Sequence, residues 1–364
     1  MKKFTLVLCF TLLFLSWQSP AQMAHSEEIK KILSEKIDSI LKETGIPSIS
    51  ISLIKGDSIM WSEAFGYTNV KKKIPATSAT IYSTGSNFKF VTATAVMQLA
   101  EAGKLKLDDP INRYLGSSAI DDFSSDGNPV TFRHLLSHHS GLKGPIEIVP
   151  LWERRVPKSL DSIAPQITAE EQPGTNFKYC NHCYAMVGLA IEKITNQSFE
   201  EYIVEKILEP LDIDSKGPIA PTPRMVEELA LPYVLENKKA VPEHQSRFDV
   251  FPAGDIYLSG PEMAKFLIAQ LNGGEYKRKS ILKKSSIVQM QEPQFGSNYG
   301  LGARVFKKGD KTYLYHTGQV PGFSTYFEIE TSSRTGVYLA SNAGGVQDML
   351  SEIAEVSLKM LNEL

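Results

Sequence analysis

Ser86 and Lys89 stand three residues apart in the stretch STGSNFKF, a spacing at which the two side chains can do nucleophilic chemistry. Residues three apart on a helix lie on the same face. A serine hydroxyl becomes a useful nucleophile when a base takes its proton, and a lysine amine is such a base when burial lowers its pKa. Spacing alone decides nothing, because Ser-x-x-Lys occurs five times, beginning at Ser39, Ser52, Ser86, Ser140 and Ser280.

The surroundings of these serines favour Ser86. It follows a turn-forming Ser-Thr-Gly and precedes an apolar helical pattern from Phe88 to Leu99. The N–H groups at the start of a helix point outward and can stabilise an oxyanion. In contrast, Ser52 lies in an alternating strand pattern whose lysine points to the other face, and Ser140 precedes a glycine in a loop. An ordinary serine at a helix start is the remaining alternative.

A second stretch, KYCNHCY, carries Tyr179 and Asn181 in a predicted turn just before a helical pattern. A phenol held near a lysine can shuttle a proton, and a carboxamide can hold the lysine or a substrate carbonyl. A turn with a core tyrosine is the structural alternative.

A third stretch, YLYHTGQVPG, places His316 and Thr317 at the end of a predicted strand. Gly318 would let a substrate backbone approach closely, and the N–H of Gln319 is a candidate oxyanion donor. A lone histidine in a strand is more often structural than functional.

Together the three motifs carry a resemblance to a known family. Ser-x-x-Lys, Tyr-x-Asn and His-Thr-Gly occur in that chain order, in helix, turn and strand patterns. The chain resembles the serine β-lactamase and penicillin-binding-protein superfamily, specifically the class C β-lactamase-related branch. LLSHHSGL at residues 135–142 resembles that branch's LLTHTSGL segment, and EPLDI, AGDIYLSGPEMAKFL, YGLG and HTGQVPGFST match other landmarks.

The resemblance implies a serine hydrolase that works without metal or cofactor. Ser86 would be the acyl-accepting nucleophile, Lys89 its base, and Tyr179 the relay that passes the proton to the leaving group. A carbonyl substrate would acylate Ser86, and water would then release the acyl group.

The resemblance also implies the substrate contacts. Asn181 would orient the substrate and the lysine, while His316, Thr317 and Gly318 would line the strand beside the substrate. The backbone N–H groups of Ser86 and Gln319 would form the oxyanion hole.

Cysteine and histidine pairs allow rival interpretations. Cys180 and Cys183 form a C-x-x-C that fits a redox pair, half a zinc site, two packed thiols or a disulfide, and the sequence leaves the disulfide open. His134 and His138 are four apart, but they lack the intervening glutamate of the metalloprotease pattern. We therefore expect no metal site.

The elements that must position these residues suggest one domain over residues 25–364. Strand patterns lie near both ends of the chain, and a mostly helical lobe occupies about 107–252. A helix is predicted from His25 to Thr44 and another over 346–364. The fold class is therefore α/β, an antiparallel sheet flanked by terminal helices with an inserted helical lobe. The site would lie between the two lobes.

Composition narrows the class and the location. The 364 residues are 42% hydrophobic and carry a net charge of −2, so nucleic acid is not expected as a partner. Residues 1–21 combine MKK, an apolar stretch and small residues, which predicts an export signal cut after Ala21 and a periplasmic or secreted protein. An uncleaved anchor is the alternative. No later segment is apolar enough to cross a membrane.

The third motif leaves the substrate open, because class C β-lactamases have Lys-Thr-Gly where this chain has His316. A lysine cation suits the carboxylate of a β-lactam, whereas a histidine is mostly neutral at pH 7. The first expectation is a D-amino-acid peptidase or carboxypeptidase acting on peptidoglycan-like peptides, with a carboxylesterase or a β-lactamase as alternatives. The alternative of another class is a non-catalytic ligand-binding protein. The oligomeric state is not readable.

Overall fold

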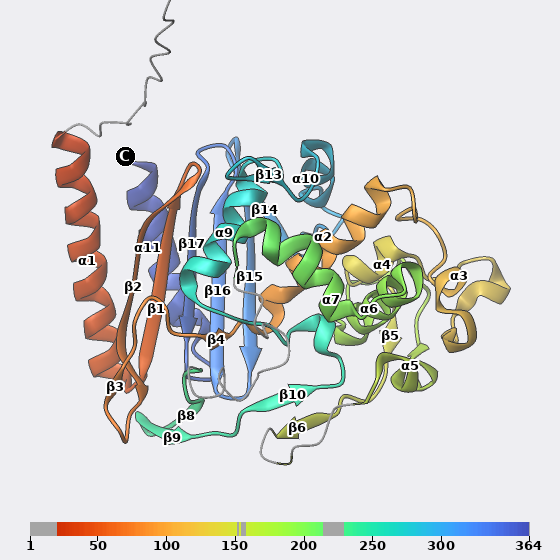
Figure 1. The fold of residues 1–364 in the computed structure, drawn as a ribbon, viewed down its shortest axis with the longest axis horizontal. Coiled ribbons are helices and arrows are strands. Elements are labelled where there is room, and N and C mark those ends of the chain that lie inside the picture. The colour runs from red at the N-terminus through yellow and green to blue at the C-terminus, as the bar shows by residue number, and fades with distance from the viewer. Residues whose placement is uncertain (1–19, 151–152, 154–157, 214–228, 364) are drawn as a thin grey trace, which may run out of the picture.

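The computed structural model describes residues 20–150, 153, 158–213 and 229–363 (Figure 1). The predicted export signal over residues 1–21 lies outside this part except for its last two residues. Those two belong to helix α1 (Pro20–Thr44), which begins five residues before the predicted start at His25. Within the described residues, no helix is both long enough and apolar enough to span a bilayer.

An antiparallel sheet is the centre of the fold, and the described residues give it seven strands in the order β14-β15-β16-β17-β1-β2-β3. These strands are β1 (Ser48–Lys55), β2 (Ser58–Asn69), β3 (Ile74–Pro75), β14 (Arg304–Lys308), β15 (Lys311–Val320), β16 (Phe323–Glu330) and β17 (Thr335–Ser341). β17 pairs with β1, so the two ends of the chain form one sheet, which confirms the predicted α/β class.

Helices cover both faces of this sheet (Figure 1). α1 and α11 (Gln347–Asn362) pack on one face, and α9 (Gly260–Leu271) and α2 (Phe88–Glu101) lie on the other side. Strand β1 shows why, since Ile49, Ile51 and Leu53 pack in the core beside α1 and α11, whereas Ser50 and Ser52 face α9. A Cβ on Gly260 would lie 2.7 Å from the Ser52 Oγ, so α9 approaches the sheet closely only with a glycine there.

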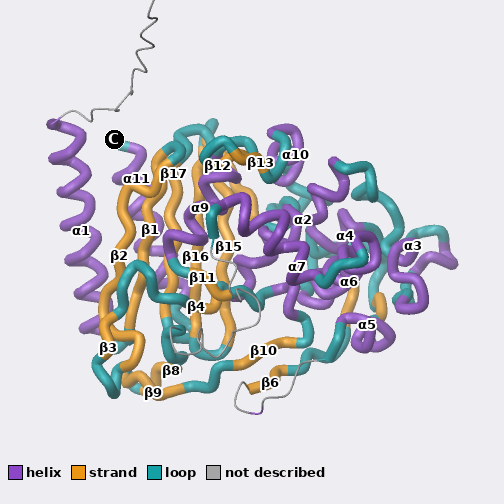
Figure 2. Tube along the Cα trace, in the orientation of Figure 1, coloured by secondary structure: helices purple, strands orange, loops and turns teal. Residues whose placement is uncertain are grey.

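The region predicted as a helical lobe, about residues 107–252, is mostly helix and loop in its described part (Figure 2). Its helices are α3 (Asn112–Leu115), α4 (Phe132–Leu136), α5 (Leu160–Ile163), α6 (Asn181–Thr195) and α7 (Phe199–Ile203). A capping box of Ser198 and Glu201 begins α7.

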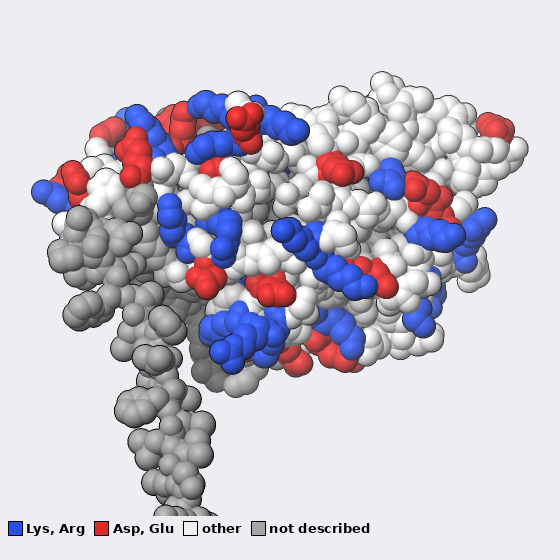
Figure 3. Space-filling view, turned by 90° about the horizontal axis from the view of Figure 1, so that it is seen from above, with Lys and Arg blue, Asp and Glu red and all other residues white. Residues whose placement is uncertain are grey.

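Short strand pairs were not predicted, because strands of two to four residues are too short to show a period. They are β5 (Leu142–Lys143) with β7 (Thr168–Ala169), β6 (Ile148–Pro150) with β10 (Ser246–Phe248), and β8 (Tyr233–Glu236) with β9 (Lys239–Pro242). Near the sheet lie β4 (Tyr82–Ser83) with β11 (Tyr257–Leu258), β12 (Glu275–Tyr276) with β13 (Lys279–Ser280), and helix α10 (Lys284–Met290). Charges of both signs are interspersed over the face shown in Figure 3.

Candidate active site

Ser86 lies in a single 3-10 turn, Gly85–Asn87, that leads directly into α2. From Tyr82 to Phe90, Ser86 is the one residue that is partly exposed, and the others are buried. Gly85 has a φ of +53°, and a Cβ on it would lie 2.8 Å from the backbone nitrogen of Gln319. A glycine before the serine therefore lets the turn sit against strand β15.

A second contact holds the turn against strand β16. The Thr325 hydroxyl donates to the Thr84 carbonyl at 2.6 Å and accepts from the Asn87 amide at 3.0 Å. All three groups are buried. A Cβ on Gly318 would lie 2.0 Å from the Thr325 Oγ1 and 2.2 Å from the Thr84 oxygen. Gly318 thus makes room for the protein's own chain rather than for a substrate backbone, contrary to the reason expected from the sequence.

Lys89 is fully buried, and its Nζ contacts three acceptors from three parts of the chain. It lies 3.1 Å from the Ser86 Oγ, 2.8 Å from the Asn181 Oδ1 and 2.7 Å from the Ala253 carbonyl oxygen. A charged ammonium would donate to all three. A neutral amine would donate to the two closer acceptors and accept a hydrogen bond from the serine, so the same geometry suits a base.

The environment of Lys89 favours the neutral amine. Burial lowers the pKa of Lys89 well below its usual value, because the surrounding protein replaces water. No carboxylate among the described residues forms an ion pair with the amine to offset this effect. The lysine therefore has the property that a general base needs near neutral pH.

Tyr179 is placed beside the same lysine, with its ring centre 4.9 Å from the Lys89 Nζ. Its side chain is 44% exposed. The protein around the ring raises the pKa of Tyr179, while a hydrogen bond with Ser86 acts in the opposite direction. Desolvation is the larger of these two effects, so the pKa of Tyr179 is raised. The phenol is therefore protonated at neutral pH and can donate a proton.

A disulfide closes the turn that carries Tyr179 and Asn181. Cys180 and Cys183 are bonded, which settles in this structure the alternative that the sequence left open. Cys180 caps helix α6, since its sulfur accepts the Cys183 N–H at 2.9 Å. The cross-link thus ties the first turn of α6 to the residue between the phenol and the carboxamide.

A directed chain of hydrogen bonds runs behind the site. The Cys180 N–H donates to the His138 Nδ1 at 3.0 Å, so that imidazole carries its proton on Nε2 and donates to the Tyr299 Oη at 3.2 Å. At the other end, the His316 Nδ1 donates to the Thr317 carbonyl at 2.6 Å. Its Nε2 is then an acceptor, and the Tyr299 hydroxyl donates to it at 2.9 Å. Every member is satisfied with both imidazoles neutral.

The electrostatics agree with neutral imidazoles. Burial lowers the pKa of His316 to about 3, and Lys89 contributes to this shift when its amine is protonated. The pKa of His138 is also well below its usual value, mainly through burial. His316 is 3% exposed, so its ring lies behind the strand rather than in the cleft. The cleft-facing residues of that strand are Thr317 and Gln319, both exposed.

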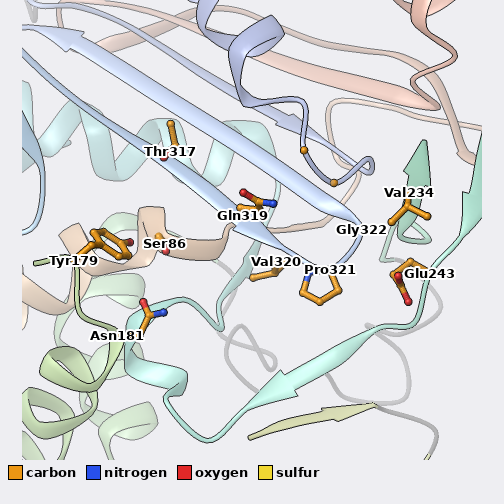
Figure 4. A pocket seen from close by; sticks show the side chains of 12 residues that line it. Ser86, Tyr179, Asn181, Val234, Glu243, Thr317, Gln319, Val320, Pro321 and Gly322 are labelled. Atoms are coloured by element: carbon orange, nitrogen blue, oxygen red, sulfur yellow. The ribbon is translucent and has the colours of Figure 1, made fainter. Parts of the chain in front are cut away.

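An open cleft of about 770 Å³ extends from these residues (Figure 4). Five of the eight predicted site residues line this cleft, namely Ser86, Tyr179, Asn181, Thr317 and Gln319. Lys89 does not line the cleft, because it is buried behind Ser86. The remaining lining residues lie farther along the cleft and are Val234, Glu243, Val320, Pro321, Gly322, Gly344 and Gly345.

Sequence reasoning missed three groups that belong to this site. The Ala253 carbonyl holds Lys89, but a backbone group has no signature in a sequence. Tyr299 lies in the YGLG landmark, which gave no hint of its bonds to two histidines. The guanidinium carbon of Arg304 lies 5.4 Å from the ring centre of Phe177. Its charge opposes the rise in the pKa of Tyr179 and adds to the fall in the pKa of His316, so it is close to both side chains.

The histidine pair that suggested a metal has other contacts. The His134 Nδ1 lies 3.2 Å from the Thr131 backbone nitrogen in a helix-capping contact, and both nitrogens of His138 belong to the chain described above. The described residues contain no group of three or more histidine, cysteine, aspartate or glutamate side chains placed to hold a metal ion.

Comparison with known proteins agrees with this geometry. The family described as Beta-lactamase matches residues 33–358. A putative penicillin-binding protein, PbpX of Bacillus subtilis (strain 168), is 30% identical over 325 residues, which cover 87% of this chain and 76% of the relative. Protein flp of Staphylococcus aureus (strain N315) is 24% identical over 327 residues, and the chain spans only 63% of its length.

Solved structures share the fold. The octameric penicillin-binding protein homologue from Pyrococcus abyssi superposes with a TM-score of 0.73 at 28% identity, over 93% of this chain and 77% of that one. EstCE1, a hydrolase with promiscuous acyltransferase activity, has a TM-score of 0.76 at 16% identity, over 93% and 100% of the two chains. The D-amino acid amidase from Ochrobactrum anthropi SV3 has a TM-score of 0.72 at 20% identity, over 92% and 99%. The last two likenesses concern the fold alone.

These findings define the class of protein: the fold and the family match are those of penicillin-binding-protein-like serine hydrolases. The chain belongs to the beta-lactamase family. The resemblance inferred from the three motifs is confirmed, and the protein is a serine hydrolase.

Thr325→Val tests how the Ser86 turn is held. The substitution keeps the shape but leaves the Thr84 carbonyl and the Asn87 amide without their partner in a buried site. We expect a loss of about 2–4 kcal/mol in the free energy of unfolding, measured by urea denaturation. Thr312→Val is the matched control, since Thr312 lies half-buried on the same sheet and its hydroxyl makes no hydrogen bond within the described residues. Equal stability of the two variants would contradict the assignment.

Tyr299→Phe tests the chain behind the site. Removing the hydroxyl leaves the His138 Nε2–H and the His316 Nε2 unpaired, and burial of unpaired polar groups costs about 1–3 kcal/mol each. We expect a lower melting temperature than for Tyr67→Phe, because Tyr67 is 43% exposed. Nitrogen NMR of the wild type should show the two buried rings as neutral at pH 6. A charged His316 at that pH would refute the chain as drawn.

Proposed function

We propose that the protein is a D-amino-acid peptidase or carboxypeptidase that acts through an acyl-enzyme on Ser86. The observation that carries the proposal is the position of Lys89, buried without an ion pair and within hydrogen-bond distance of the Ser86 hydroxyl. Burial prepares the amine to take the proton from the nucleophile. A serine that only capped a helix would not need a buried lysine beside it.

The proposed reaction has two halves. In the first, the Ser86 Oγ attacks the substrate carbonyl carbon and gives its proton to the Lys89 Nζ, while the N–H groups of Ser86 and Gln319 hold the oxyanion. The carbon–nitrogen bond then breaks, and the leaving amine takes a proton from the Tyr179 hydroxyl. Lys89 then passes the proton that it took from Ser86 to the Tyr179 oxygen. In the second half, water attacks the acyl-enzyme and gives its proton to Lys89 or Tyr179, and the Ser86 Oγ leaves with a proton.

Arg304 supports a substrate with a free carboxylate. His316 is neutral and has both ring nitrogens engaged, so it cannot supply the cation that a carboxylate needs. Arg304 lies on β14 opposite Tyr315, two residues before Thr317 along β15. Its one side-chain hydrogen bond among the described residues is a 3.4 Å contact with the Asn298 Oδ1, which leaves most of its donors available.

A carboxylesterase and a β-lactamase are the alternatives within the same chemistry, and the acyl-enzyme on Ser86 is common to all three. A substrate panel separates them, because an esterase turns over neutral esters but not peptides, and a β-lactamase turns over β-lactams. A non-catalytic binder would turn over nothing.

We also propose that the protein works outside the cytoplasm. Support comes from the signal-like residues 1–21 and from the Cys180–Cys183 disulfide, since disulfides persist mainly in oxidising compartments. The mass of the protein recovered from its native host would show whether the chain begins after Ala21.

Intact mass after brief exposure to a penicillin tests the nucleophile. We expect the wild type to gain the full mass of the penicillin, because opening the lactam ring releases no leaving group, and Ser86→Ala to gain none. On a D-alanyl-D-alanine peptide, the same variant should lose at least about 10³-fold in kcat/KM with its fold retained. Unchanged turnover by Ser86→Ala would exclude the proposal.

The dependence of kcat/KM on pH tests the base. Lys89 can accept the proton only when neutral, so activity should fall as pH drops through its lowered pKa in the free enzyme. The pKa of His316 is about 3, so we expect no separate inflection near pH 6.5. An inflection near 6.5 that disappears in His316→Gln would assign the base to the histidine instead.

A further inference from the structure

We propose that the far end of the cleft, at Glu243, is a subsite for an ammonium group on the acyl side of the substrate. The inference rests on the proposed function, because it concerns the substrate of the same site. It names a substrate class, a peptide whose acyl part carries a free amine.

The cleft gives Glu243 a defined position relative to the reaction. Tyr179, which would protonate the leaving group, lies on one side of Ser86, while Val320, Pro321 and Glu243 lie on the other (Figure 4). A substrate whose leaving group is next to Tyr179 must therefore extend its acyl part along β15 toward Glu243. A cleft of about 770 Å³ has room for several residues of a peptide.

The strand beside this path is open on the cleft side. β14 pairs with β15 only as far as the Arg304–Tyr315 position, whereas β16 continues to pair with β15 up to Val320. Among the described residues, no strand pairs with residues 316–320 on the side of β14, so an extended peptide can lie along this edge. Thr317 and Gln319 are exposed there.

Glu243 has a charge that no cation in the described part of the chain neutralises. Its Oε1 accepts the His244 backbone N–H at 2.8 Å, and its carboxylate makes no ion pair within the described residues. Val234, Val320 and Pro321 line the cleft beside it, so water is partly excluded. A half-buried carboxylate with apolar neighbours attracts a cation more strongly than a fully exposed one does.

The two ends of the site consequently have opposite charges. The charge of Arg304 acts on Tyr179, which is at the leaving-group end, and Glu243 lines the acyl end. A peptide with a terminal carboxylate and a free amine several bonds upstream would match both. The amine has two chemical sources, the side chain of a diamino acid or the free N-terminus, and the ammonium chemistry is common to them.

Three lysyl-D-alanyl-D-alanine tripeptides distinguish the two possible sources of the amine. One has both lysine amines acetylated, one has only the side-chain amine free, and one has only the α-amine free. We expect the wild type to prefer one or both free-amine peptides about three- to tenfold in kcat/KM, mainly through a lower KM. Which peptide is preferred identifies the source.

Glu243→Gln should remove the preference, so that its kcat/KM no longer differs among the three peptides. Glu236→Gln is the matched control, since Glu236 is an exposed carboxylate at the end of the neighbouring strand β8 and does not line the cleft. Glu243→Lys should reverse the preference toward a peptide whose side-chain amine is succinylated, and that gain of activity requires a folded protein.

The outcomes keep the two proposals apart. Equal kcat/KM of the wild type for all three peptides would overturn the ammonium subsite and leave the peptidase in place. A preference for free amines that persists in Glu243→Gln would also overturn it. Absence of turnover of every peptide, together with turnover of esters, would overturn the peptidase and the subsite with it.

Discussion

The site depends on one buried amine. Lys89 has no contact with water and no counter-ion among the described residues, yet three oxygens surround its Nζ. Those oxygens come from the 3-10 turn at Ser86, from the first residue of α6 and from a second 3-10 turn, Phe251–Ala253, after β10. Each element must keep its place, because an amine that lost these partners in a buried position would be costly. The packing of the helical lobe against the sheet therefore also fixes the position of the Lys89 amine.

The histidines nearby follow from the same constraint. A cationic imidazole close to Lys89 would add repulsion to a site that is already short of water. His138 and His316 avoid this by sharing Tyr299 in a chain that satisfies every ring nitrogen without a charge. The chain also ties the backbone of Cys180, next to the phenol, to the carbonyl of Thr317 on the substrate strand. Both walls of the cleft are thereby joined behind the reacting groups.

Much of this arrangement was predictable from local patterns, and the reasons for the exceptions are physical. Ser86 and Lys89 meet because helix spacing brings them together, and the hairpin of β1 and β2 shows the period of a strand. Contacts between distant segments leave no such trace. Every residue has a backbone carbonyl, so the sequence does not indicate that the one of Ala253 contacts Lys89. Nor does it indicate which face of the sheet the His316 side chain occupies. Gly318 was predicted to make room for a substrate, but the space it leaves is filled by Thr84 and Thr325.

The three motifs account for the chemistry of the site but say little about its substrate. The roles proposed for Ser86, Lys89 and Tyr179 require only a carbonyl, and a neutral His316 does not discriminate by charge. Discrimination would then come from groups that a substrate meets before and after the carbonyl. In our proposal those groups are Arg304 at one end and Glu243 at the other, joined by the edge of β15 that β14 leaves unpaired. A fold that keeps its reacting groups buried and neutral can change its substrate by changing the ends of the cleft, without disturbing the lysine on which the reaction depends.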